Sequence, residues 1–227
     1  MKSLLGLTLA AAAGVSLATP AGAVPIRVRG TVAAITSSTL TVRTAQGNVP
    51  VSFKGNTAFV SVVPSDLNHV RPGGYVGVAS KNAGDRLIAL SVIVFPPSMK
   101  GAAEGHAAYD VLPDTTLSGG ARTASSMTNA SVRTIGNLGA PQVNSSMTNG
   151  SVAAAAASGG VKLLTVTYRG GRQNILVPPT APIVAFVPAR ESIVTPGASV
   201  FVNADKANGK ITAALVAVGR NGHNPPF

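Results

Sequence analysis

The chain of 227 residues contains no cysteine and no tryptophan, and aromatic residues make up only 4% of it. The absence of cysteine excludes disulfides, thiolate metal sites and thiol nucleophiles. The scarcity of aromatic rings leaves few platforms on which nucleic-acid bases could stack. We therefore expect an ordinary hydrophobic core, and no specific nucleic-acid partner.

Acidic residues are also scarce, with seven Asp and Glu against 18 Lys and Arg. A carboxylate pair for glycoside hydrolysis would have to come from these seven, and several of them lie in turn sequences such as Gly84-Asp85. The G-x-S-x-G motif of a serine hydrolase is absent from the sequence. The sequence therefore predicts a protein that is not an enzyme.

Long apolar runs are missing beyond the first residues, so we expect no transmembrane span in the mature chain. The N-terminus itself has a positive start at Lys2, an apolar stretch over Leu4–Leu17 and an A-x-A site at Ala21–Ala23. These three regions, in this order, are typical of a secretory signal peptide. The sequence predicts a signal-peptide helix over residues 1–23, a mature chain that begins at Val24, and a periplasmic or secreted location.

What the sequence does contain is a pattern of period two. Ile26 and Val28 alternate with Arg27 and Arg29, and similar short runs rich in Val and Thr recur along the chain between Gly, Pro and Asn residues. Such runs are typical of half-buried antiparallel strands, and Ala45–Asn48 has the composition of a hairpin turn. The predicted fold class is all-β.

The chain also repeats itself. At an offset of 124 residues, Leu40–Val42 aligns with Leu164–Val166, and Pro72-Gly73 aligns with Pro196-Gly197. Matched Pro and Gly residues are informative because each constrains the backbone dihedral angles of a turn. The first strand matches at an offset of 120, which places Gly30 on Gly150.

We therefore predict a first β module over residues 24–95, an irregular connector rich in Gly, Ser and Thr over 96–149, and a second β module over 150–227. Each module offers about six short strands and one brief helical turn, at 64–70 and 188–194. Such a module can hide its strand edges by closing into a small OB-like barrel. A sandwich of two open sheets is the alternative that the pattern leaves open.

The phrase SSMTN occurs twice, at Ser125–Asn129 and at Ser145–Asn149. The second copy directly precedes Gly150, where the repeat places the first strand of the second module. We therefore predict that the later copy enters this strand and that the earlier copy is a duplicate which lengthens the connector.

The connector carries the residues Ala103–Asp110, A-E-G-H-A-A-Y-D, followed by S-M-T-N-A-S-V at Ser126–Val132. With the repeated G-x-V, L-T-V, V-P and P-G framework, these phrases resemble a family of exported proteobacterial proteins with a domain of unknown function. That family typically has G-E-G-H-R-P-W-D in the middle segment and often bears the label "metal ABC transporter permease". The resemblance implies OB-like barrels and an envelope location. It implies no permease, because a permease needs several apolar spans.

This chain departs from the family pattern where Arg, Pro and Trp are replaced by Ala107, Ala108 and Tyr109. In the same segment, Glu104, His106 and Asp110 are residue types that can ligate a divalent metal. One hypothesis is thus a metal-binding periplasmic protein that uses these three residues. The alternative is a structural motif in which His106 and Asp110 form hydrogen bonds that hold the connector against a barrel.

The net charge of +11 is spread over a chain in which only 11% of residues are charged, so the surface is sparsely positive. Four basic residues occupy the polar phase of three successive predicted strands: Arg27, Arg29, Arg43 and Lys54. On one face they could bind phosphate or carboxylate groups of an anionic envelope polymer. The alternatives are a solvated strand face with no ligand, and a structural or assembly role with another envelope protein as the partner.

Overall fold

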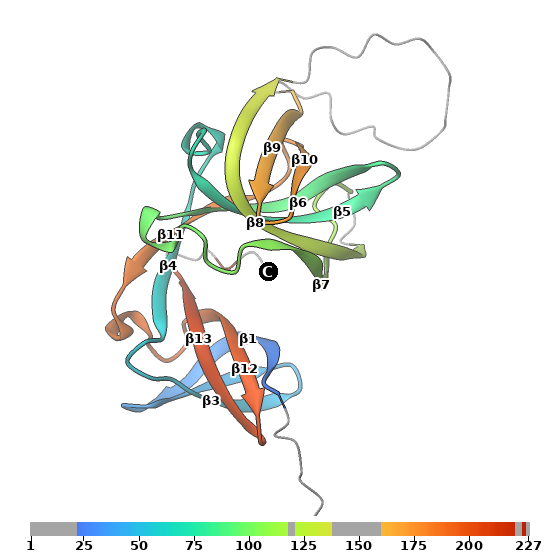
Figure 1. Ribbon diagram of the computed structural model, residues 1–227. Helices are drawn as coiled ribbons and strands as arrows, with labels where there is room; N and C mark the ends of the chain where they lie inside the picture. The colour runs from blue at the N-terminus through green and yellow to red at the C-terminus, as the bar shows by residue number, and fades with distance from the viewer. Residues whose placement is uncertain (1–21, 118–120, 138–159, 221–223, 226–227) are drawn as a thin grey trace, which may run out of the picture.

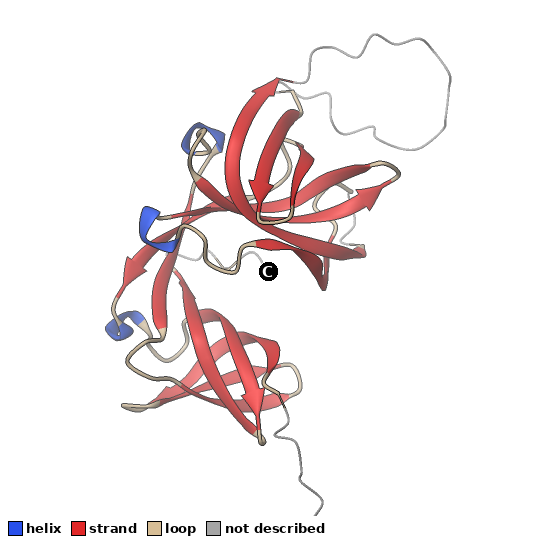
Figure 2. Cartoon of the chain, viewed as in Figure 1, coloured by secondary structure: helices blue, strands red, loops and turns tan. Residues whose placement is uncertain are grey.

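The computed structural model describes residues 22–117, 121–137, 160–220 and 224–225 (Figure 1). The described chain is almost entirely β-structure, as the sequence predicted (Figure 2). Its strands are β1 (Val24–Ile35), β2 (Thr39–Thr44), β3 (Gly47–Ser52), β4 (Ala58–Pro64), β5 (Tyr75–Ala83), β6 (Arg86–Phe95), β7 (Gly105–Pro113), β8 (Arg122–Asn137), β9 (Lys162–Tyr168), β10 (Gly171–Val177), β11 (Ile183–Ala189), β12 (Ser199–Ala207) and β13 (Lys210–Gly219).

Alternation explains why these segments are strands. In β2, Leu40 and Val42 are 1% and 0% exposed, whereas the neighbouring Arg43 is exposed to solvent. The predicted hairpin is confirmed, because β2 pairs antiparallel with β3 from Thr44↔Gly47 to Thr39↔Ser52. Three short 3-10 helices complete the described structure, and two of them, η1 (Leu67–His69) and η3 (Glu191–Ile193), lie where the brief helical turns were predicted. The third is η2 (Pro97–Met99).

The strands form two closed rings. In the first strand ring, β1 pairs with β2 and β12, β12 pairs with β13, and β13 meets β3 in parallel at Thr212↔Ser52. In the second strand ring, β8 pairs with β5 and β9, β5 pairs with β6, and β10 pairs with β9 and, in parallel, with β6. The two rings lie one above the other in Figure 1. That either ring is OB-like stays a prediction.

The two halves of the sequence do not each close on themselves, so the predicted modules 24–95 and 150–227 are wrong as spatial units. The first ring takes β1, β2 and β3 from the first half and β12 and β13 from the second, and the other ring takes β5 and β6 from the first half. Strands β4 and β11 carry the chain between the rings and pair antiparallel with each other, with Val62 opposite Phe186. The repeated sequence could not show that the two halves exchange strands. Equivalent strands of both copies have the same alternation of apolar and polar residues, so each fits either partner.

The repeat itself is evident in matched backbone hydrogen bonds. The amide of Val32 donates to the carbonyl of Ala198 at 2.9 Å, and the amide of Val132 donates to that of Gly74 at 2.8 Å. The amide of Gly197 donates to the carbonyl of Val32 at 2.8 Å, and the amide of Gly73 donates to the carbonyl of Val132 at 2.9 Å. The two rings are thus built alike, and Val132 on β8 is the structural equivalent of Val32 on β1.

This equivalence corrects the prediction for residues 96–149. The described part of this range is not an irregular connector, because it contains β7 and β8, and β8 supplies the first strand of the second copy. The earlier SSMTN phrase therefore lies in a ring strand, and the prediction that it only lengthens the connector is wrong. The second phrase and the predicted strand entry at Gly150 lie outside the described residues.

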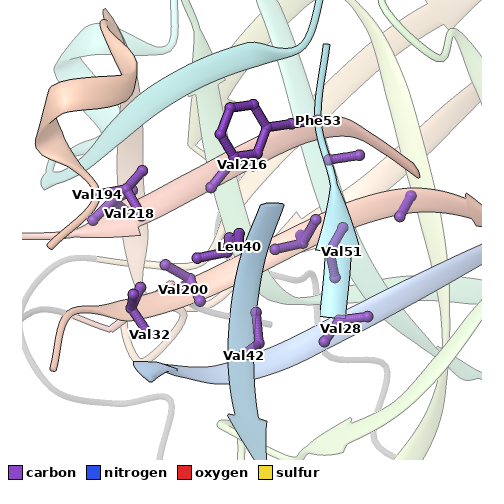
Figure 3. Close-up of a cluster of buried hydrophobic side chains, with 13 residues drawn as sticks. Val28, Val32, Leu40, Val42, Val51, Phe53, Val194, Val200, Val216 and Val218 are labelled. Atoms are coloured by element: carbon purple, nitrogen blue, oxygen red, sulfur yellow. The ribbon is translucent and has the colours of Figure 1, made fainter. Parts of the chain in front are cut away.

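The exchanged strands share hydrophobic cores. In the first ring, Leu40 and Val51 from the first half pack in one cluster with Val200 and Val216 from the second half (Figure 3). The second ring has an equivalent cluster that includes Leu164 and Ile175. A third cluster lies where the rings meet, and its residues are Val60, Val62, Ile93, Val184, Phe186, Phe201 and Ala217.

None of the helices in the described part of the chain has the length and apolar character that a membrane crossing requires. Residues 1–21 of the predicted signal peptide lie outside the described ranges.

Candidate functional site

Strand β7 lies outside both rings and pairs only with β8 among the described strands. The chain enters it through Ala103, whose φ is 48°, and Gly105, whose φ is 148°. Tyr75, whose hydroxyl donates to the carbonyl of Ala102 at 3.0 Å, holds this entry in place. Burial and then the negative charge of Glu104 raise the pKa of Tyr75 to about 12, so its hydroxyl stays protonated at neutral pH.

A bulge in β7 aims two side chains at the first strand ring. The pairing with β8 shifts between Ala108 and Val111, which leaves Tyr109 and Asp110 in the bulge. Asp110 accepts hydrogen bonds from Arg27 at 3.1 Å and from Arg29 at 2.5 Å, and all three side chains are about one-third exposed. Two guanidinium groups thus share one carboxylate, and this cluster of Arg27, Arg29 and Asp110 has a net charge of +1.

Aromatic rings support the cluster from both sides. The guanidinium carbon of Arg27 lies 4.1 Å from the centre of the Tyr109 ring, and that of Arg29 lies 5.1 Å from the Phe201 ring. Burial raises the pKa of Tyr109, although the nearby charges of Arg29 and Arg27 act in the opposite direction. The phenol is therefore neutral at pH 7, and it adds no second negative charge to the cluster.

The cluster faces a groove of about 980 Å³ between the start of β1 and the end of β7. Arg122, at the start of β8, adds a third guanidinium group to the lining and donates a hydrogen bond to the carbonyl of Val111. The remaining walls are largely apolar, and four of their residues are prolines: Pro25, Pro113, Pro182 and Pro225. The groove therefore combines three guanidinium groups, one carboxylate and apolar walls.

The predicted basic face does not come together as a whole. Arg27 and Arg29 meet at Asp110, but Arg43 lies opposite Asn48 in the β2–β3 hairpin, and Lys54 follows the far end of β3. Asn48 and Ser52 are four residues apart along β3, which separates the two ends by about 13 Å. Alternation correctly placed the side chains on the polar phase, but it carries no information on their separation along the strands.

The predicted metal site is wrong for the described structure. Glu104 accepts a hydrogen bond from the amide of Arg169 at 3.2 Å, and His106 Nδ1 bonds to Thr128 Oγ1 at 2.8 Å, while Asp110 holds the two arginines. Within the described ranges, no group of three or more His, Asp or Glu residues could hold a metal ion. The three predicted ligands point to three different partners, because the bulge turns Asp110 away from the earlier part of β7.

The structure supports part of the alternative, in which these residues hold the segment in place. His106 bonds to β8 and stacks with Tyr168 at 6.4 Å between ring centres, and Asp110 ties β7 to β1. The alternative would also allow a hydrogen bond between His106 and Asp110, but these two residues bond to different partners. Arg122 was missed by sequence reasoning, since nothing local links it to Arg27 and Arg29.

A second ion pair anchors the far end of β7 to the second strand ring. Lys81 Nζ lies 2.6 Å from Asp114 Oδ2, and Asp114 is only 5% exposed. Thr116 donates its amide and its hydroxyl to the other carboxylate oxygen. Burial raises the pKa of Asp114, but the hydrogen bonds from Lys81 and Thr116 outweigh it, and the pKa lies below its ordinary value.

We expect Asp114→Asn to lower the free energy of unfolding at pH 7 by about 1–3 kcal/mol, because Lys81 loses its charged partner. The depressed pKa means that this stabilisation is complete above the ordinary Asp value of about 3.9 and is lost as the pH falls through the lower folded value. The difference between wild type and Asp114→Asn should therefore shrink on acidification. Urea unfolding over a pH series measures it, with Asp85→Asn at an exposed position as the control. A difference that stays constant below the ordinary Asp pKa would contradict the assignment.

Comparison with known proteins gives no relative: no family model, no curated protein and no solved structure matches this chain.

Proposed function

We propose that this chain is a non-enzymatic binding protein for an anionic ligand, which it holds in the groove lined by Arg27, Arg29 and Arg122. The observation that carries this proposal is the set of three guanidinium groups in one groove with a single carboxylate among the described lining residues. The groove thus has an excess of two positive charges, which favours a ligand with at least two negative charges.

The donor groups of the groove are not all used. The Nε of Arg29 is buried, and it has no hydrogen-bond partner among the described residues. That atom is closed to solvent, so ligand oxygens would meet the outer guanidinium nitrogens of Arg27, Arg29 and Arg122, which bind carboxylate and phosphate oxygens strongly. Planar guanidinium groups match such oxygens in pairs, which favours arginine over lysine at this kind of site.

The proline-rich walls favour a ligand that has a carbon skeleton between its charges. Pro25, Pro113 and Pro182 present apolar surface beside the arginines. An acidic polysaccharide has this combination of carboxylates and apolar ring faces, whereas inorganic phosphate has only the charge. We therefore propose an acidic envelope polysaccharide as the ligand class.

An envelope location is part of the same proposal. It is supported by the order of positive, apolar and A-x-A regions in residues 1–23 and by the resemblance of Ala103–Asp110 to the exported family. The mass of the protein recovered from the envelope fraction tests it, because export with cleavage leaves Val24 as the first residue.

The binding experiment uses a fluorescently labelled oligogalacturonate and fluorescence anisotropy. Raising the ionic strength from about 0.01 M to about 1 M shortens the Debye length from about 30 Å to about 3 Å. We expect affinity to fall by at least about tenfold over this range, and Arg122→Gln to weaken binding by about tenfold at low salt.

Arg43→Gln is the matched control, since Arg43 is an exposed arginine of the first strand ring outside the groove. Thermal melting of each variant shows whether it is folded. Equal weakening by Arg43→Gln and Arg122→Gln would mean that only the overall charge matters. Binding that ignores salt, or no binding at all, would overturn the proposal.

A structural or assembly role stays a prediction, and no described surface favours it over ligand binding. The mass of the protein in solution would show whether copies associate.

A further inference from the structure

A separate cavity of about 580 Å³ lies between the two strand rings and has only Arg27 in common with the described lining of the groove. Its apolar lining includes Ile93, Phe95, Phe186, Phe201 and Leu215, all of which belong to or pack against the core cluster where the rings meet. Phe95 packs edge-on against Phe186, with ring centres 5.4 Å apart. The volume is within the range of about 300–1,000 Å³ that is usual for small-molecule sites.

Small residues keep the cavity open. On the side of β7, the lining residues Ala103, Gly105, Ala107 and Ala108 have almost no side chain, and Ala214 of β13 is also part of the lining. Ala107, Ala108 and Ala214 are exposed, so the cavity is accessible from solvent. A ligand would therefore contact aromatic rings on one wall and the backbone of β7 on the other.

Charge distinguishes the two ends of the cavity. Arg27 lies at the Tyr109 end. Its positive charge is only partly balanced, because Asp110 also forms an ion pair with Arg29. Glu104 lies at the other end of the β7 segment, five residues from Tyr109, which is about 16 Å along an extended strand. An anionic group is thus favoured near Arg27 and disfavoured near Glu104, which selects a ligand with one charged end.

We propose that this cavity binds a small apolar anion, such as a medium-chain or aromatic carboxylate or sulfonate. Its acidic group is held at Arg27, and its apolar body packs against Phe95, Phe186 and Phe201. This site goes beyond the proposed polysaccharide groove and does not depend on it, although Arg27 borders both.

The test uses 8-anilinonaphthalene-1-sulfonate, a fluorescent apolar anion, with decanoate as a competitor. We expect saturable binding to one site on the folded protein and displacement by decanoate. Ala108→Trp places an indole in the cavity and should weaken binding by at least about tenfold. Ala214→Phe narrows the cavity from β13 and should have the same effect, which keeps the test valid if one of the two variants fails to fold.

The matched variants separate this site from the groove. Arg122→Gln changes only the groove and should leave binding of the probe unchanged, whereas Arg27→Gln should weaken it about threefold to tenfold. Ala108→Trp should in turn leave oligogalacturonate binding unchanged. If folded Ala108→Trp and Ala214→Phe bind the probe as well as wild type, or if decanoate does not compete, the proposal is wrong. That result would not affect the separate proposal that the groove binds an acidic polysaccharide.

Discussion

A chain that carries Ser80→Cys and Ser126→Cys should form a single disulfide between β5 and β8 on mild oxidation. The Ser80 and Ser126 hydroxyl oxygens are 3.2 Å apart, and the two residues are direct partners in the antiparallel pairing of these strands. The sequence contains no other cysteine, so no competing disulfide is possible. The bridge closes a long loop, and we expect the free energy of unfolding to rise by about 2–4 kcal/mol. Gel mobility without reductant and urea unfolding measure the two effects.

The control for this prediction is Ser126→Cys with Ala204→Cys. If each half of the chain closed on itself, β8 would pair with β12, and residue 126 would face Ala204, the equivalent of Ser80 in the repeat. In the structure, Ala204 instead pairs with Ile26 of β1. We therefore expect no disulfide in the control. A disulfide in the control, and none in Ser80→Cys with Ser126→Cys, would show that the strands are not exchanged.

Leu40→Ala and Leu164→Ala should each lower the free energy of unfolding by about 2–5 kcal/mol. Leu40 and Leu164 occupy equivalent positions of the repeat, are 1% and 0% exposed, and lie in the cores of the first and the second strand ring. Removing a buried leucine side chain loses its transfer free energy and leaves a cavity. Chemical denaturation monitored by circular dichroism measures the change.

Leu117→Ala provides the same chemical change at a residue that is 45% exposed, and we expect it to cost less than about 1 kcal/mol. A loss as large as that of the buried leucines would mean that burial does not set the cost. If either Leu40→Ala or Leu164→Ala has no effect, the corresponding core is not packed as described.

Local features of the fold were predictable from sequence. The alternation of Leu40 and Val42 with polar neighbours requires only the two-residue period of a strand, and the hairpin after Thr44 requires only a turn sequence between two such runs. The brief helical turns η1 and η3 were predictable because the repeat places a short non-strand segment at equivalent positions, 64–70 and 188–194. Each of these signals lies within a few residues of the structure that it specifies.

The candidate site was predictable only in part. Arg27, Arg29 and Asp110 were each singled out by residue type, but as members of two different sites. They form one cluster because a bulge in β7 turns Asp110 towards β1, across sequence separations of 83 and 81 residues. No local pattern encodes such a contact, and the same holds for Arg122, which reaches the groove from β8.

By itself, the sequence determined that the chain is all-β, that it contains two related copies of one strand pattern, and that its charge is positive. These properties follow from side-chain alternation and composition, which act locally. Only the tertiary structure decided which copy of each strand pairs with which, and therefore where the arginines and the cavity lie. The physical reason is that strand pairing uses backbone hydrogen bonds and similar apolar faces. Both copies offer these equally. Which strands pair therefore depends on how β4 and β11 carry the chain from one ring to the other.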